Sequence, residues 1–357
     1  MLKNDFIGQL DRGASVTTPL AAAILGHLSK ELKKGDPPWW REAAKAWEKR
    51  KFVAWNEAWT LFLTCLHFEA LNSAESPLQP YFPSCGGTDE ADPSVGLAKF
   101  LADPPKSFYE NLREGRRRAF VPVRSVFWTA PAALFFPRRR LPFYLVEIEA
   151  GAGLNLVADL LYPVKTWDAS FVSARIGLDV KPLDMHDIYH RRWLTAGLLP
   201  DNLKSIVEMD KAADAVAQIR KEDPSFLQIV PCPSEKAARF IAKNIPADDP
   251  EVGLLFMNMG VTCRMTDEEY KAFSKSIAEA LAPWGDRGLW VEVEQVRGEF
   301  YSTTHQLRVH RVVDGGLRAA VLTSIDIEAG KFQDHPGADE ILAVARPSSP
   351  SPKRRGA

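Results

Sequence analysis

The chain has 357 residues, 46% of them hydrophobic and 25% charged, as in a globular protein with a core domain and an accessory region. A formal net charge of −1 argues against a general nucleic-acid-binding protein, which normally has a strongly basic face. The chain contains neither a signal-peptide core nor an apolar run long enough to span a bilayer, so we expect a cytoplasmic protein without a membrane partner. Four widely separated cysteines without Cys-x-x-Cys spacing argue against a zinc ribbon or a disulfide framework.

The first part of the chain is predicted to be helical. Thr18 followed by Pro19 indicates a helix start, and Gly35 indicates its end. A second helix is expected from near Pro38, and short helices are expected at 93–101 and 106–113 after a turn-rich break at 81–87. A further helix carries apolar side chains at helical spacing, which favours core packing over a cofactor site: Trp55, Trp59, Phe62, Leu63 and Leu66. We assign residues 1–119 to a helical accessory domain or lid.

After Pro142 the pattern changes to strands that alternate with helices. Strands are predicted at 143–148, 171–180, 226–230, 252–257 and 289–296, with helices at 154–161, 202–219 and from Thr266 onward. A hairpin across Asp314-Gly-Gly316 closes the series. The fold class is therefore α/β, a doubly wound, mostly parallel, Rossmann-like sheet with an antiparallel C-terminal edge, at 120–345. The Pro/Ser-rich tail, 346–357, is predicted to be disordered.

The most informative segment is the end of the first predicted strand and the turn that follows it. Glu147 ends a nearly continuous apolar run, and Gly151 and Gly153 then allow positive φ and close approach of a ligand. Backbone N–H groups at such a turn suit an anion or a nucleotide edge. This pattern is typical of S-adenosylmethionine (SAM) sites, with the carboxylate towards the methionine ammonium. The alternative is an ordinary strand-to-helix turn whose glycines serve packing.

The same segment carries a family resemblance. The string Glu147-Ile-Glu-Ala-Gly-Ala-Gly-Leu-Asn-Leu156 resembles an uncharacterised bacterial family with Glu-x-Gly-Ala-Ser-Ala-Gly-Leu-Asn-Leu at this place. Other stretches are similar too: Tyr81-Phe-Pro-Ser-Cys-Gly-Gly87, Arg175-Ile-Gly-Leu-Asp179, Pro182-Leu-Asp184 and Arg192-Trp-Leu194. Those proteins look like class I SAM-dependent methyltransferases with a helical N-terminal addition. Glu147, Gly151 and Gly153 match that pattern, whereas Glu149 replaces the usual first glycine and must point away, contact the ammonium or block the site.

Further candidates follow from the rule that ligands bind at the carboxyl ends of parallel strands. Asn155 is expected to bond the carboxylate or amine of SAM, or to cap a helix, and Asp179 to bind the ribose, or to form a turn. Asn258 is the candidate for orienting the acceptor. Tyr162 is expected to place its aromatic face against the sulfonium, or to serve only in packing. Cys232 and Ser234 follow the third strand, near where an adenine edge would lie. Glu292 and Glu294 share one face of the fifth strand, and a general base could be among them.

We expect SAM-dependent alkyl transfer to a small molecule, most simply by a methyltransferase. The leaving group is already activated, so alignment and desolvation suffice and no metal is expected. His186 and His190 have metal-ligand spacing without a convincing third ligand, and a polar surface helix is the preferred interpretation. One alternative is a cyclase that converts SAM itself to azetidine-2-carboxylate and methylthioadenosine. Another is a non-catalytic, methyltransferase-shaped binding protein. The sequence indicates neither the acceptor nor the oligomeric state.

Overall fold

The computed structural model describes residues 1–117, 125–136, 141–161, 168–296, 304–326 and 331–334. The chain divides into two compact units. A helical unit comprises the described part of 1–122 together with 183–222, and a sheet unit comprises the described parts of 123–182, 223–297 and 302–357. The sequence-based division placed 183–222 in the sheet domain, whereas in the structure this segment belongs to the helical unit. Predictions for Tyr162 and for the tail at 346–357 lie outside the described residues.

The helical unit confirms the helices expected from its start and stop signals. Helix α2 begins directly after Thr18 and ends before Gly35, and α3 begins at Pro38. The described helices of this unit are α1 (Lys3–Ser15), α2 (Pro19–Lys34), α3 (Pro38–Ala46), α4 (Glu57–Asn72), α5 (Ser94–Ala102), α6 (Lys106–Glu114), α9 (Ile188–Ala196) and α10 (Leu203–Glu222), with short 3-10 turns η1 (Gln79–Tyr81) and η2 (Pro83–Cys85).

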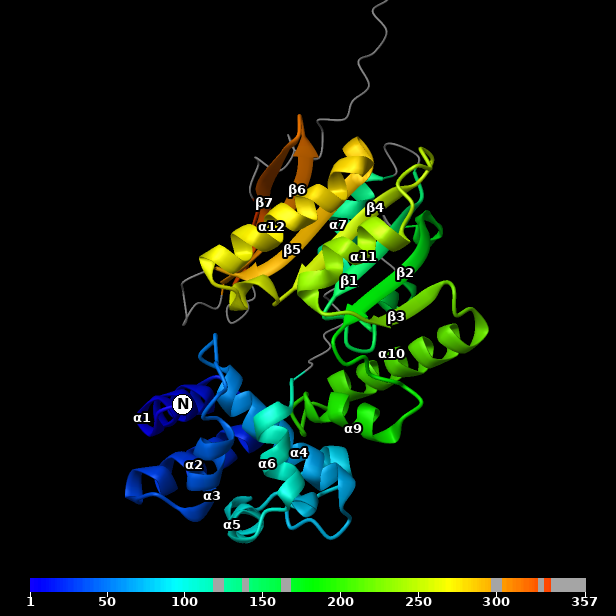
Figure 1. Ribbon diagram of the computed structural model, residues 1–357. Helices are drawn as coiled ribbons and strands as arrows, with labels where there is room; N and C mark the ends of the chain where they lie inside the picture. The colour runs from blue at the N-terminus through cyan, green and yellow to red at the C-terminus, as the bar shows by residue number, and fades with distance from the viewer. Residues whose placement is uncertain (118–124, 137–140, 162–167, 297–303, 327–330, 335–357) are drawn as a thin grey trace, which may run out of the picture. The chain divides into compact units, whose positions relative to one another are not determined.

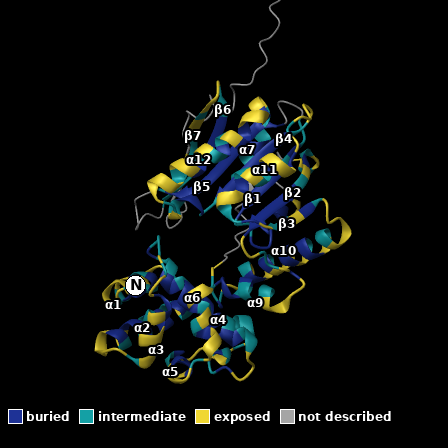
Figure 2. Ribbon diagram, viewed as in Figure 1, coloured by how far each residue is buried: buried dark blue, intermediate teal, exposed yellow. Residues whose placement is uncertain are grey.

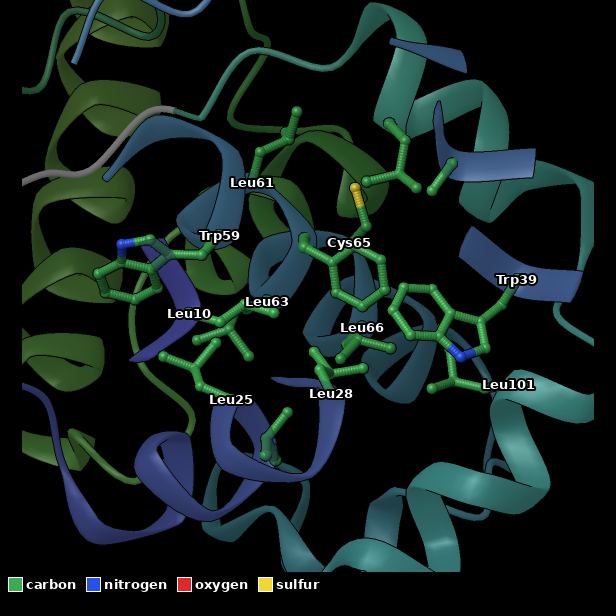
Figure 3. Close-up of a cluster of buried hydrophobic side chains, with 14 of the residues drawn as sticks. Leu10, Leu25, Leu28, Trp39, Trp59, Leu61, Leu63, Cys65, Leu66 and Leu101 are labelled. Atoms are coloured by element: carbon green, nitrogen blue, oxygen red, sulfur yellow. The ribbon is translucent and has the colours of Figure 1, made fainter. Parts of the chain in front are cut away.

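Helix α4 forms the centre of the core of this unit. Buried side chains lie on most of its faces, and leucines and tryptophans from other segments surround it (Figure 3). Trp55 and Trp59 are 4% and 6% exposed, which confirms their assignment to packing. Phe6 stacks on Trp40 with ring centroids 5.3 Å apart. The aromatic side chains of this part of the chain therefore build a hydrophobic core.

A buried histidine joins α4 to the segment that follows α9. The Nδ1 atom of His67 lies 3.1 Å from the Leu198 carbonyl oxygen, and Nε2 lies 2.7 Å from Ser84 Oγ. Because a carbonyl only accepts, Nδ1 must carry the proton, and the Ser84 hydroxyl then donates to Nε2. Burial of the ring lowers the pKa of His67 to about 4. The folded chain therefore holds this imidazole neutral.

This lowered pKa predicts a loss of stability in mild acid. The unfolded chain binds the proton near pH 6.5, whereas the folded chain binds it only near pH 4, so stability present above pH 6.5 is lost as the pH falls through this window. The expected loss from His67 is roughly 3 kcal/mol in total, at about 1.4 kcal/mol per pH unit. Chemical denaturation of wild type and His67→Gln between pH 4 and 7 measures it. The variant should show a flatter dependence, and exposed His186→Gln should match wild type. Equal slopes for wild type and His67→Gln would refute this assignment.

The sheet unit is built on a mixed sheet with the strand order β3-β2-β1-β4-β5-β6-β7-β8 among the described residues. The parallel strands are β1 (Phe143–Ile148), β2 (Val172–Asp179), β3 (Leu227–Pro231), β4 (Gly253–Met259) and β5 (Gly288–Gln295). The antiparallel strands are β6 (Thr304–Val313), β7 (Gly316–Asp326) and β8 (Lys331–Asp334). A mostly parallel sheet with an antiparallel C-terminal edge is thus confirmed.

Helices cover both faces of the parallel strands. Helices α11 (Ala237–Asn244) and α12 (Asp267–Leu281) cover one face of the sheet, as Figure 1 shows. Their apolar side chains share a buried cluster with Val146, Ile148 and Trp290. Helix α7 (Ser125–Phe135) lies on the other face, and Phe136 after it stacks on Phe143 of β1 at 4.1 Å. In Figure 2 the central strands β1, β4 and β5 are almost wholly buried between these layers. Since side chains alternate along a strand, odd-numbered residues of β1 face α7 and even-numbered residues face α12.

Two local predictions in this unit are confirmed. Thr266 and Glu269 form the reciprocal capping box that begins α12. The β6–β7 hairpin turns through Asp314 and Gly315, whose φ angles of 52° and 75° suit the right-handed twist of a two-residue turn. Among the described helices, none combines the length and apolar character needed to cross a membrane.

Candidate functional site

The direction in which strands are added reverses beside β1. Strands β2 and β3 lie on one side of β1, whereas β4 and β5 lie on the other. In open α/β sheets, ligands bind outside the carboxyl ends of the strands at such a reversal. The loops that follow β1, β2, β3 and β4 therefore define the candidate site.

Glu147 lies near the end of β1 on the α7 side of the sheet. It is 2% exposed, and its Oε1 accepts a hydrogen bond from Asn155 Nδ2 at 2.8 Å. Asn155 begins the short 3-10 turn η5 (Asn155–Val157), and Trp128 Nε1 of α7 donates to its backbone carbonyl. Asn155 Oδ1 is buried and accepts no hydrogen bond from the described residues. The structure thus brings two predicted site residues into direct contact and leaves an acceptor beside the carboxylate.

The glycine turn is held by the end of β2. Gly151 has a φ of 61°, and its N–H donates to Asp179 Oδ2 at 2.9 Å. Asp179 Oδ1 accepts from the backbone N–H of Lys181, also at 2.9 Å, and the residue is 1% exposed. Asp179 therefore lies beside the turn, as the sequence predicts, and serves as its structural anchor. The assignment of Asp179 to a ribose remains a prediction.

Gly153 has a packing role. Its φ is 80°, and a Cβ there would lie 2.5 Å from Cδ1 of Ile229 on β3. Gly177 of β2 faces the same group, because a Cβ there would lie 2.8 Å from both Ile229 Cδ1 and Ala150 Cβ. Close approach of the turn to β2 and β3 accounts for both glycines, so the packing interpretation weighed above applies to Gly153.

Glu149 has a positive φ, a backbone conformation that glycine adopts more readily than other residues. Its φ is 53°, and a left-handed conformation costs a non-glycine residue on the order of 1–3 kcal/mol. The side chain turns to other loops. Its Oε2 lies 3.1 Å from Arg264 Nη1 after β4, and Oε1 lies 3.5 Å from Ser234 Oγ after β3. Glu149 thus links the loops of three strands with a side chain that is 16% exposed.

Asn258 does not join this group. Leu254 and Phe256 of β4 pack in the cluster beneath α12, so alternation places Asn258 on the α12 face, opposite the face of Glu147. Its side chain is 0% exposed, donates to Glu294 Oε1 at 2.6 Å and accepts from Trp290 Nε1 at 2.7 Å. These contacts engage both ends of the Asn258 amide within the fold, and its expected role in orienting an acceptor stays a prediction. The residue belongs to a buried structural network.

Glu294 is the centre of that network. Besides Asn258, its carboxylate accepts the backbone N–H groups of Val261 at 2.8 Å and Cys263 at 3.1 Å. Burial, together with the nearby charge of Glu292, raises the pKa of Glu294. This carboxylate fixes the loop after β4, the same loop that presents Arg264.

Glu292 lies on the same strand face, as predicted, and is surrounded by donors. Burial acts to raise the pKa of Glu292, but hydrogen bonds from His310 and Thr262 and the charge of Arg308 outweigh it and lower that pKa. Tyr270 of α12 also donates to Glu292 at 3.2 Å. A carboxylate stabilised in its ionised form by several donors is a poor general base, so we assign Glu292 a structural role.

The sequence interpretation missed one buried ion pair next to the site. Arg175 of β2 and Asp159 of α8 (Ala158–Leu161) are both 0% exposed and paired, and Arg175 also donates to the carbonyl of Leu156. The pair fixes the segment that follows the glycine turn. The sequence did carry a signal for this pair, because Asp159 and Arg175 each stand as a single charge within an apolar stretch. A charged side chain that is buried normally requires a partner.

These features define the class of the protein. It is an α/β protein with a helical unit, and its mostly parallel sheet carries a carboxylate, a tight glycine turn and an ion pair at the strand reversal. The chain belongs to the family described as "Uncharacterized protein conserved in bacteria (DUF2332)", whose model matches residues 3–167 and 161–328. Membership of an uncharacterised bacterial family was predicted from the motif and is confirmed. Comparison with the curated proteins gives no match.

Proposed function

We propose that the sheet unit binds SAM at the carboxyl ends of β1 and β2 and transfers an alkyl group from it to a small molecule, most simply as a methyltransferase. The observation that carries this proposal is the contact between Glu147 and Asn155 beside the glycine turn at the strand reversal. The strand order 3-2-1-4-5 of the parallel part is that of doubly wound nucleotide-binding sheets.

The hydrogen-bond acceptors at this site fit the ammonium of the amino-acid end of SAM. An ammonium has N–H donors and no acceptor, and Glu147 together with Asn155 Oδ1 supplies a negative charge and a neighbouring neutral acceptor. Bound SAM would supply a methyl group on an activated sulfonium. The protein then has to hold and align this group and keep water away from it. The anchored turn at Gly151 and the buried pair of Arg175 with Asp159 make the site rigid.

Glu147→Gln tests the placement, because the variant keeps the size of the side chain and an acceptor for Asn155 while removing the charge. We expect the affinity for S-adenosylhomocysteine to fall about 10- to 100-fold, the cost of one charge-assisted contact. Glu279→Gln on the exposed face of α12, 68% exposed, is the matched control and should bind like wild type. Equal affinity of wild type and Glu147→Gln would place the ligand elsewhere.

Product analysis separates the two reactions. Purified protein incubated with SAM alone should yield no methylthioadenosine if it is a methyltransferase awaiting its acceptor. Methylthioadenosine together with azetidine-2-carboxylate, formed without an acceptor, would instead identify the intramolecular cyclase. Chromatography with mass detection measures both products.

A further inference from the structure

The ion pair between Glu149 and Arg264 lies at the place where the loops after β1, β3 and β4 meet. Both partners are partly accessible, with side chains 16% and 42% exposed. A pair of this kind contributes little to stability, since water screens it, and it is easily opened. The left-handed backbone of Glu149 adds an unfavourable term that a glycine would not have. Stability alone therefore gives a weak account of a glutamate at this position.

We propose that Arg264 binds the carboxylate of the amino-acid end of the ligand and that Glu149 occupies this position on Arg264 until the ligand displaces it. The inference rests on the proposed SAM site and deepens it. Arg264 belongs to the loop after β4, which Glu294 holds through the N–H groups of Val261 and Cys263, so its backbone is fixed next to the end of β1. Glu149 follows Glu147 by two residues and contacts Arg264, so the turn after β1 connects an anion, Glu147, with a cation, Arg264.

A zwitterion fits this arrangement. Its ammonium would be held at Glu147 and Asn155, and its carboxylate would replace that of Glu149 on the Arg264 guanidinium. The exchange conserves the charge pairing of Arg264, because one carboxylate takes the place of another. The displaced Glu149 side chain turns towards water through the opening at which it is already partly exposed. Glu149 thus acts as an internal competitor that weakens binding of ligands with an amino-acid end.

Calorimetry with two probes tests the proposal on the full-length protein. S-adenosylhomocysteine carries the amino-acid end, whereas methylthioadenosine has the same nucleoside without it. Arg264→Met should weaken S-adenosylhomocysteine binding about tenfold, and both Glu149→Gln and Glu149→Gly should strengthen it about tenfold, the value of one charge-assisted pair. Methylthioadenosine should bind all four proteins with the same affinity within about twofold.

The outcomes separate this inference from the proposed function. If S-adenosylhomocysteine and methylthioadenosine both bind wild type but the substitutions change neither affinity, or change both equally, the roles of Arg264 and Glu149 are wrong and the SAM site stands. Weaker S-adenosylhomocysteine binding in Glu149→Gln would also overturn the inference, because Glu149 would then be a ligand contact. If neither probe binds any of the proteins, the proposed function itself fails. Glu149→Gln changes no backbone preference, so it keeps the test valid even if Glu149→Gly alters the turn.

Discussion

Replacing Arg175 with methionine is expected to lower the free energy of unfolding by about 3–5 kcal/mol. Both charged side chains of the pair are 0% exposed, and Arg175 Nη2 lies 2.9 Å from Asp159 Oδ2. The guanidinium also lies over the rings of Phe226 and Trp128, at 5.3 and 5.9 Å from their centroids. Removing the cation takes the Arg175 guanidinium away from the buried carboxylate of Asp159, which costs far more than the pair itself contributes. Denaturation by urea, monitored by tryptophan fluorescence, measures the change.

Two controls make this result specific. The double variant Arg175→Met with Asp159→Leu removes both charges and should recover most of the lost stability, because a well-packed apolar pair often replaces a buried ion pair without penalty. Lys106→Met breaks an exposed ion pair, 90% and 47% exposed, and should cost less than about 0.5 kcal/mol. A single variant that loses under about 1 kcal/mol, or a double variant as unstable as the single one, would disprove the role of the pair.

Replacing Glu294 with alanine should cost about 2–6 kcal/mol, since two N–H groups, one buried and one partly buried, lose this acceptor at about 1–3 kcal/mol each. These groups belong to Val261 and Cys263, and Asn258 loses its acceptor at the same time. The physical reason is that Glu294 is 0% exposed, so its carboxylate satisfies these N–H groups at a place that bulk solvent does not reach. The same denaturation experiment measures the loss.

Glu294→Gln is the matched variant for this prediction. Its side chain keeps the size and one acceptor oxygen but loses the other, so its loss should be intermediate. Hydrogen exchange at Val261 and Cys263 provides a local measurement, and both amides should exchange faster in Glu294→Ala than in wild type. Unchanged exchange at both amides would show that Glu294 does not hold this loop.

The sequence predicted much of the fold because its local signals agree with the tertiary structure. The capping box at Thr266 and the turn at Asp314 specify backbone geometry within a few residues, and both are found in the structure. Strand β1 is apolar over nearly its whole length, as a strand buried on both faces must be. The contacts of Glu147 with Asn155 and of Gly151 with Asp179 also agree with a site predicted at the carboxyl ends of β1 and β2.

Non-local packing limited the remaining predictions. The segment 183–222 lies between two strands in sequence, where a crossover helix is normally expected, and the sequence gives no sign that it joins the helical unit. It does so through contacts such as that of Trp193 with Phe68, at 5.2 Å. The sequence also does not show on which face of the sheet Asn258 lies, because β4 is apolar on both sides and its pattern does not alternate. Helix α11 and strand β8 were not predicted; β8 is only four residues long.

The central claim is that the end of β1 and its turn bind the amino-acid and nucleoside parts of SAM. Titration of the wild-type, full-length protein with S-adenosylhomocysteine in a calorimeter tests it most directly. We expect a heat of binding that corresponds to one site per chain, and a sharply lower affinity in Glu147→Gln. A folded wild-type protein that gives no heat with S-adenosylhomocysteine, SAM or methylthioadenosine would contradict it.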